Sequence, residues 1–198
     1  MIEALLALIA GGGYPGIILL TFVETIFPPL PSEVFMPMAG YVAARGDLSL
    51  FGVIASGTLG SLAGASFWYA VGRAIGLDRA RDLAARHGRW LTLRPRDIDR
   101  GNAWFARHGG AVVLFGRMMP GIRSVVSVPA GIAHMTVRRF LLLSCVGTII
   151  WTSVLMGAGY WLGAEYGRVA VWADPISKLV IFGLVGGYLY RLVTFKAD

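Results

Sequence analysis

Two apolar stretches of this chain contain several prolines together with charged residues, which are acidic in the first half and basic in the second. Both stretches are apolar enough to lie at membrane depth. A charge there costs roughly 2.5 to 3.5 kcal/mol on insertion scales and is retained mainly where function or a partner requires it. The two stretches are therefore the first candidates for a functional site. Their charged residues are Glu24, Glu33, Arg117 and Arg123.

The apolar residues of the chain occur in long blocks and not in amphipathic stripes. The composition is 56% hydrophobic and 15% charged, and the mean hydropathy is +0.67. Such blocks reach or approach the ~20 residues that a helix needs to cross the hydrocarbon of a bilayer. We therefore predict an all-α, multi-pass membrane protein with spanning helices at 4–23, 51–72, 140–162 and 176–192.

The proline-bearing stretches do not fit a continuous spanning helix. Proline removes a backbone donor and breaks helices, and unsatisfied backbone at membrane depth is tolerated only where protein or a water-filled cavity covers it. We predict that both stretches are re-entrant hairpins, shaped by Pro28, Pro31 and Pro120.

Most of the net charge of +7 comes from residues 73–108, which contain nine arginines, four aspartates and two histidines. Nucleic acid would bind such a segment, but a short basic loop between hydrophobic blocks is more typical of the cytoplasmic side of a membrane protein. We predict a cytoplasmic loop at about 77–108 and no nucleic-acid partner. Within it, residues 97–108 are predicted to form an amphipathic helix at the membrane surface, with Trp104 and Phe105 among its anchors.

The two halves of the chain resemble each other at an offset of about ninety residues. The matched pairs include Pro28 and Pro120, Glu33 and Arg123, Gly40 and Gly131, and Tyr69 and Tyr160. We predict a single transmembrane domain over residues 1–198, with repeat 1 at about 24–76, repeat 2 at about 112–167 and a C-terminal span at about 176–192.

The basic loop sets the orientation of the two repeats. With this loop in the cytoplasm, the first hairpin enters the membrane from outside and the second from inside, and both chain termini lie in the cytoplasm. The predicted fold is an inverted repeat of two re-entrant hairpins, each followed by a spanning helix, with flanking N- and C-terminal helices. Many secondary transporters are built in this way and bind their substrate where the repeats meet.

Hairpins that enter from opposite faces would bring the glutamates and the arginines together near the membrane centre. Arg117 and Arg123 carry forks of donors that fit the oxygens of phosphate or carboxylate, and they do not lose their charge. Gly121 would allow a tight turn between them, and a helix that begins after Pro120 would direct free amide groups toward the same anion. We predict that these residues bind an anionic substrate.

Glu24 and Glu33 are predicted to exchange protons and to gate this site. A carboxylate at membrane depth is destabilised when it is charged, so it can take up a proton and compete with the substrate for the arginines. The alternative is an ion pair that serves the structure alone, although a bare pair of this kind is costly to desolvate.

Enzymatic chemistry is not expected. A lipid phosphatase would need a nucleophile beside a base and an acid. The three histidines lie in no such motif and lack metal-ligand spacing, and Cys145 is the single cysteine. We therefore predict no catalytic residue, no metal site and no cofactor.

The chain resembles the DedA family of bacterial inner-membrane proteins, which is related to the eukaryotic VTT-domain lipid scramblases. The resemblance covers nearly the whole chain and is most specific at Glu24 with residues 28–33, at residues 115–123, and at Gly147 with Trp151. It implies a multi-pass protein of the bacterial inner membrane that moves lipid carriers, notably undecaprenyl phosphate, with a link to the proton-motive force.

The resemblance also implies roles for the four charged residues. The acidic pair of the family maps onto Glu24 and Glu33, although aspartate is common at the second position, and the basic pair maps onto Arg117 and Arg123. The leading hypothesis is a flippase that recycles undecaprenyl phosphate, with membrane lipid and protons as partners. The alternatives are a phospholipid scramblase or flippase and a proton-coupled ion or small-solute transporter.

Overall fold

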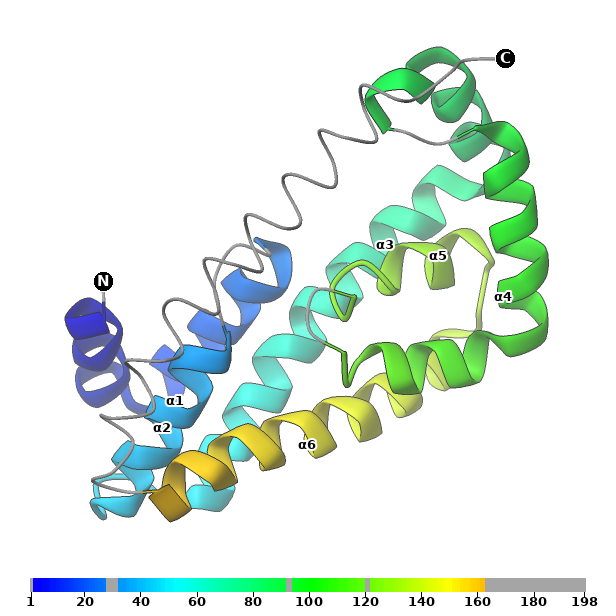
Figure 1. Ribbon diagram of the computed structural model, residues 1–198. Coiled ribbons are helices and arrows are strands. Elements are labelled where there is room, and N and C mark those ends of the chain that lie inside the picture. The colour runs from blue at the N-terminus through cyan, green and yellow to red at the C-terminus, as the bar shows by residue number, and fades with distance from the viewer. Residues whose placement is uncertain (1, 28–31, 92–93, 120–121, 163–198) are drawn as a thin grey trace.

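The computed structural model describes residues 2–27, 32–91, 94–119 and 122–162, and every regular element within these ranges is an α-helix. This agrees with the predicted all-α class. The helices are α1 (Ile2–Ile26), α2 (Ser32–Ala44), α3 (Leu50–Leu91), α4 (Pro95–Gly116), α5 (Ser127–Ile132) and α6 (Val137–Leu162). In Figure 1, α1 and α2 lie at one end of this part of the molecule and α4 at the other, with α3 and α6 extending between them.

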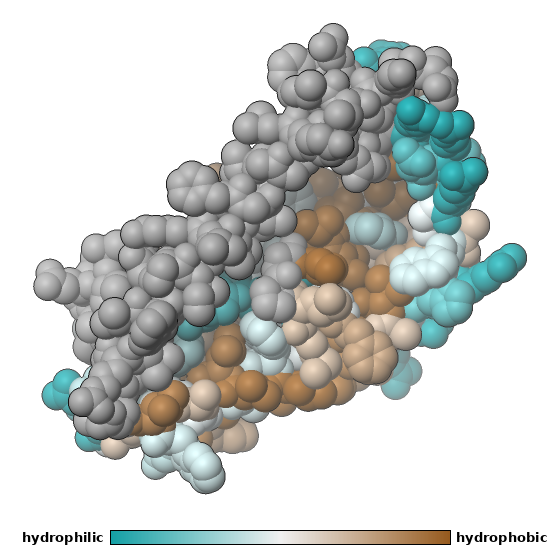
Figure 2. All heavy atoms as spheres, viewed as in Figure 1, coloured by the Kyte–Doolittle hydropathy of each residue, from teal (hydrophilic) through white to brown (hydrophobic). Residues whose placement is uncertain are grey.

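Among the described helices, α3 and α6 are long and apolar enough to cross a membrane, over Leu50–Arg86 and Val137–Leu162. They contain the spans predicted at 51–72 and 140–162. Apolar side chains gather over α6 in Figure 2, whereas hydrophilic ones gather over the first turns of α4. The large apolar residues that α6 exposes include Val137, Leu142, Val146, Ile149, Ile150 and Val154. A helix with such an exposed apolar face is suited to contact with lipid.

The segment predicted to span the membrane at 4–23 lies within α1. Gly13 interrupts this helix with a left-handed φ of 53°, and Pro15 follows two residues later. Glycine adopts this conformation without a steric cost, whereas proline removes a backbone donor from the helix. α1 is therefore two helical pieces joined at a kink. The C-terminal span predicted at 176–192 lies outside the described residues.

The basic segment expected to be a loop at about 77–108 is helical over most of its length. α3 continues beyond its apolar part to Leu91, and α4 begins at Pro95, a residue suited to the first turn of a helix. Its alanine, arginine and leucine residues favour a helix despite the charge of the segment.

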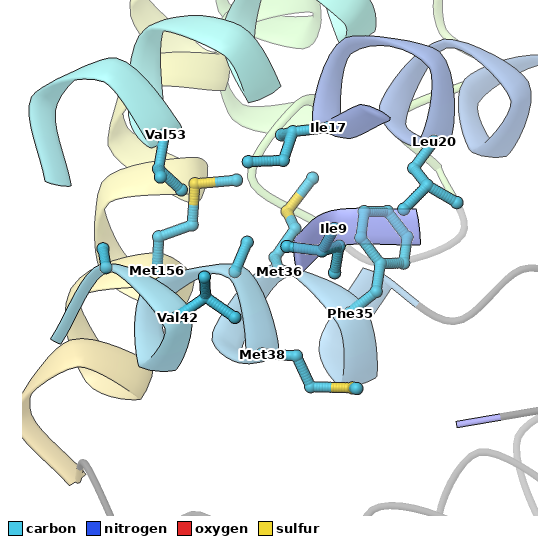
Figure 3. Close-up of a cluster of buried hydrophobic side chains, with 11 residues drawn as sticks. Ile9, Ile17, Leu20, Phe35, Met36, Met38, Val42, Val53 and Met156 are labelled. Atoms are coloured by element: carbon cyan, nitrogen blue, oxygen red, sulfur yellow. The ribbon is translucent and has the colours of Figure 1, made fainter. Parts of the chain in front are cut away.

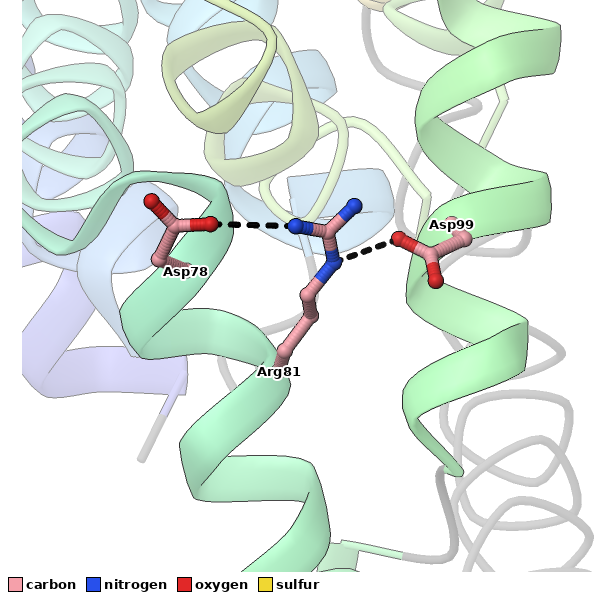
Figure 4. A network of polar contacts seen from close by, with 3 residues as sticks. All are labelled: Asp78, Arg81 and Asp99. Atoms are coloured by element: carbon pink, nitrogen blue, oxygen red, sulfur yellow. Dashed lines mark hydrogen bonds and ion pairs between the residues drawn. The ribbon is translucent and has the colours of Figure 1, made fainter.

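Arg81 connects the two helices of this basic segment (Figure 4). Its Nε donates a hydrogen bond to Asp99 Oδ1 of α4 at 2.6 Å, and its Nη1 donates to Asp78 Oδ1 of α3 at 3.0 Å. This exposed network fixes the start of α4 beside the end of α3.

α4 contains the amphipathic helix predicted at 97–108 and extends it to Gly116. Trp104 is 56% exposed, as a surface anchor should be, but Phe105 is only 5% exposed. Phe105 packs in a buried cluster that also contains Val113 and Phe140. It is therefore a core residue and not an anchor, because α4 lies against the rest of the protein on that face.

The larger buried core lies between α1, α2, α3 and α6 (Figure 3). Its fully buried side chains include Ile9, Ile17, Phe35, Met36, Val53 and Met156. Within a membrane, such residues hold helices together through van der Waals contact, because lipid tails are as apolar as the side chains. This core secures α1 and α2 against the two long helices.

Each of the two short helices packs closely on the long helix from the other half of the chain. α2 contacts α6, where a Cβ on Gly40 would meet the backbone of Met156 and Tyr160. α5 contacts α3, where a Cβ on Gly131 would meet the backbone of Tyr69. Glycine lets helix backbones approach this closely. The two halves of the chain are therefore interlocked.

We expect Gly159→Ala to destabilise the protein. A Cβ at Gly159 would meet the backbone of Pro37 in α2, whereas a Cβ at Gly157 of the same helix meets nothing within 4 Å. Overpacking costs about 1 to 3 kcal/mol, while alanine favours a helix over glycine by about 0.5 to 1 kcal/mol. Gly157→Ala should therefore leave stability unchanged or slightly higher. Thermal unfolding in detergent measures the stability of both variants. Equal midpoints would contradict the close contact of α2 with α6.

Candidate functional site

Arg117 and Arg123 lie where α4 ends and the chain turns toward α5. Arg117 is the C-terminal cap residue of α4, and Arg123 lies in the turns between the two helices. Their exposed fractions are only 1% and 5%. Both arginines that the sequence singles out are therefore interior residues, and each needs a partner for its charge.

The backbone that follows these turns differs from the helix expected after Pro120. Residues 122–126 form turns, and α5 begins only at Ser127. α5 is short and carries Pro129 in its first turn, where the missing N–H has no helical partner to lose. The described helix therefore begins after Arg123 and not between Arg117 and Arg123. Pro120 and Gly121 lie outside the described residues.

Glu24 of α1 forms a buried ion pair with Arg123. Only 4% of the Glu24 side chain and 6% of the Arg123 side chain are exposed. The pair joins an acidic residue of the first half to a basic residue of the second. Glu24 Oε2 has no hydrogen-bond partner in the described part of the chain.

α3 positions Glu24 by holding the end of α1. A Cβ on Gly64 of α3 would meet the side chain of Thr25, so the two helices are in close contact beside Glu24. Trp68 Nε1 donates a hydrogen bond to the backbone oxygen of Thr25 at 3.2 Å. The carboxylate is thereby held on the inner side of α1, toward Arg123.

Arg117 has donors that no described residue uses. Its Nη2 donates to Ser127 Oγ at 3.3 Å, but Nε and Nη1 are buried without a partner in the described ranges. Gly147 of α6 makes room for this side chain, because a Cβ there would lie 2.9 Å from Arg117 Cβ. Arg117 is thus a buried cation whose guanidinium fork is only partly hydrogen-bonded.

Three side chains of α6 also carry buried polar atoms without a partner among the described residues. They are Ser144 Oγ, Thr148 Oγ1 and Trp151 Nε1. None of these three was among the site residues predicted from the sequence. Their spacing of four and three residues places them on one face of a helix, which is the signal that could have identified them.

The remaining predicted site residues contribute less to this arrangement. Glu33 lies in the first turn of α2, is half-buried and forms no ion pair with a described residue. Pro28 and Pro31 lie outside the described residues. In the described ranges no cluster of three histidine, cysteine, aspartate or glutamate residues is placed to hold a metal ion.

The charges of this interior do not cancel. Arg123 is neutralised by Glu24, whereas Arg117 is paired with no carboxylate among the described residues. A buried, partly unsatisfied guanidinium attracts an anion that can accept its remaining hydrogen bonds, and phosphate and carboxylate oxygens match its geometry. The arrangement can therefore hold an anionic group.

Comparison with known proteins identifies the class of protein to which this fold and site belong. Residues 30–161, well over half of the chain, match the VTT domain. The chain belongs to the VTT domain (DedA) family and is a membrane protein. This confirms the resemblance seen in the sequence.

Three relatives illustrate the family. An alkaline phosphatase-like protein of Lactococcus lactis is 39% identical, over 92% of this chain and 86% of its own. A protein of Bacillus subtilis named undecaprenyl phosphate transporter A is 30% identical, over 91% of this chain and 89% of its own. A protein of the same name in Staphylococcus aureus is 28% identical, over 92% of this chain and 90% of its own. No solved structure matches the chain.

We expect Arg123→Leu to destabilise the protein strongly and Glu24→Leu to restore much of that loss when the two are combined. Removing one partner of a buried ion pair leaves an uncompensated charge, which costs about 3 to 5 kcal/mol, whereas replacing both partners by apolar residues is often neutral. Thermal unfolding of the two single variants and the double variant gives the coupling free energy. Additive effects would show that the two side chains do not interact.

Proposed function

We propose that this protein transports a lipid-carrier phosphate across the bacterial inner membrane, and that undecaprenyl phosphate is its substrate. The observation that carries the proposal is Arg117, a buried guanidinium with two donors that no described residue uses. A phosphate group accepts hydrogen bonds from such a fork. Two relatives are named undecaprenyl phosphate transporter A, which supports the same ligand.

The buried ion pair between Glu24 and Arg123 can be opened by the substrate, which makes Arg123 available to the phosphate. In the empty state Glu24 holds Arg123. An incoming phosphate competes with the carboxylate for that arginine, and Glu24 takes up a proton because it loses its counter-charge in an interior that disfavours an unpaired anion. We propose that Glu33 of α2 also exchanges protons. Release of the lipid returns Glu24 to Arg123 and frees the proton, so transport is linked to the proton gradient.

The movement of the substrate requires two halves that can shift against each other. We propose that the proline-bearing stretches are re-entrant hairpins in an inverted repeat, with both chain termini in the cytoplasm. The matched contacts of α2 on α6 and of α5 on α3 support this arrangement, because each repeat contributes one short helix to the other. Rocking of such repeats exposes a central site to alternate sides of a membrane.

Other functions are consistent with the same site. A phospholipid scramblase would move lipid without a proton gradient, and a proton-coupled small-solute transporter would move no lipid. The phosphatase-like name of the Lactococcus relative suggests release of inorganic phosphate, whereas a transporter needs no nucleophile. The proposal therefore includes no catalytic residue, and the proteoliposome experiments below separate these possibilities.

We expect Arg117→Ala to reduce transport of a fluorescent undecaprenyl phosphate analogue in proteoliposomes at least tenfold, because the phosphate loses its free donor fork. Arg117→Lys should recover part of the rate, since it restores the charge without the fork. Arg81→Ala, which removes an arginine of the exposed α3–α4 network, is the matched control and should transport normally. Wild-type protein that behaves like empty liposomes would overturn the proposed substrate, and phosphate release would indicate an enzyme.

We expect an imposed proton gradient to change the transport rate of the wild type and not that of Glu24→Gln. The amide cannot exchange a proton at the position where the substrate displaces the carboxylate. Asp47→Asn serves as the control, because Asp47 is 61% exposed and lies beside Arg45 at the surface. A wild-type rate that is independent of the gradient would favour the scramblase.

A further inference from the structure

The three unpaired polar atoms of α6 lie on one face of the helix. Successive helical residues are ~100° apart, so Ser144, Thr148 and Trp151 fall within an arc of roughly 60°. Ser144 and Thr148 are 0% and 3% exposed, and the Nε1 atom of Trp151 is buried as well. These residues therefore form a row of interior donors, which we call the α6 donor row.

The α6 donor row lies within four residues of Gly147, the point where α6 touches Arg117. Gly147 lies on the same side of α6 as the row, and it is there that α6 touches Arg117: a Cβ on Gly147 would lie 2.9 Å from Arg117 Cβ. Nε and Nη1 of Arg117 are the other buried donors in the described ranges that have no partner. Unused donors therefore occur on both sides of this contact between α6 and the end of α4.

Neighbouring polar residues of α6 differ from the donor row. Thr152 donates to the backbone oxygen of Thr148 at 2.9 Å and lies 3.3 Å from Thr58 Oγ1 of α3. A buried hydroxyl of α6 can therefore find hydrogen-bond partners within the protein. A buried polar group without a hydrogen-bond partner lowers the stability of the protein. Its presence in a native structure therefore points to a ligand or a functional role.

We propose that the α6 donor row and Arg117 together bind the terminal phosphate of a phosphate monoester lipid. This inference rests on the function proposed above and adds three residues of α6 to its substrate site. Two free donors of Arg117 and three of α6 suit a group with three terminal oxygens, each of which accepts more than one hydrogen bond. A phosphodiester headgroup has only two such oxygens and a second substituent that the enclosed Arg117 site would have to accommodate.

The test compares binding of farnesyl phosphate, a monoester, and of dioctanoyl phosphatidylglycerol, a diester, to the full chain in detergent. We expect Thr148→Val and Trp151→Phe each to weaken farnesyl phosphate binding tenfold or more. The diester should bind the wild type more weakly than the monoester does, and the same variants should change its affinity less than twofold. The thermal midpoint of Thr148→Val without ligand should be equal to that of the wild type or higher, because valine removes the unpaired hydroxyl at nearly constant volume.

Thr152→Val is the matched control, since it lies one turn from Thr148 on the same helix. It loses hydrogen bonds that are already made, so its thermal midpoint should fall while farnesyl phosphate binding stays within twofold. A loss of binding that accompanies a loss of stability in Thr148→Val would instead indicate a structural role and overturn the proposal.

Arg117→Ala separates this proposal from the proposed function. Loss of farnesyl phosphate binding in Arg117→Ala, with unchanged binding in Thr148→Val and Trp151→Phe, would overturn the donor row and leave the transporter proposal intact. Unchanged binding in all three variants would overturn both. Equal losses for the monoester and the diester in the α6 variants would overturn the selection of a terminal phosphate.

Discussion

The burial of two guanidinium groups is the constraint on which the rest of this structure depends. An arginine in an interior of low polarity cannot discard its charge, so it needs a carboxylate, a hydrogen-bonding partner or a ligand. Arg123 is paired with the carboxylate of Glu24. Among the described residues, Arg117 has only a hydrogen bond to Ser127. The difference between these two arginines gives the site one satisfied charge and one that is available to an anion.

The helices around this site hold the two arginines by close backbone contact. Gly64 leaves room for the end of α1 that carries Glu24, and Gly147 leaves room for Arg117 beside α6. Elsewhere Gly40 and Gly131 join each half of the chain to the long helix of the other half. These helices are therefore held together by contacts through small residues and few polar bonds, because helix pairs in lipid are held mainly by packing.

Stability and function make opposite demands on the interior. The core of α1, α2, α3 and α6 is closely packed with apolar side chains, whereas α6 also carries hydroxyl and indole groups without described partners. Replacing such groups by apolar ones would stabilise the empty fold. Their presence beside a closely packed core fits a binding site whose ligand completes the hydrogen bonds.

The sequence by itself determined the membrane class, the two spans now seen in α3 and α6, and the burial of Glu24, Arg117 and Arg123, because long apolar blocks with charges inside them leave a strong local signal. It did not show how far the basic segment is helical or that Phe105 is buried, since charge content says little about whether a segment is helical or which face packs. Only the tertiary structure decided that Glu24 pairs with Arg123, that Arg117 keeps free donors, and that three α6 side chains have no described partner. These features depend on contacts between residues far apart in the chain, which periodicity and spacing do not encode.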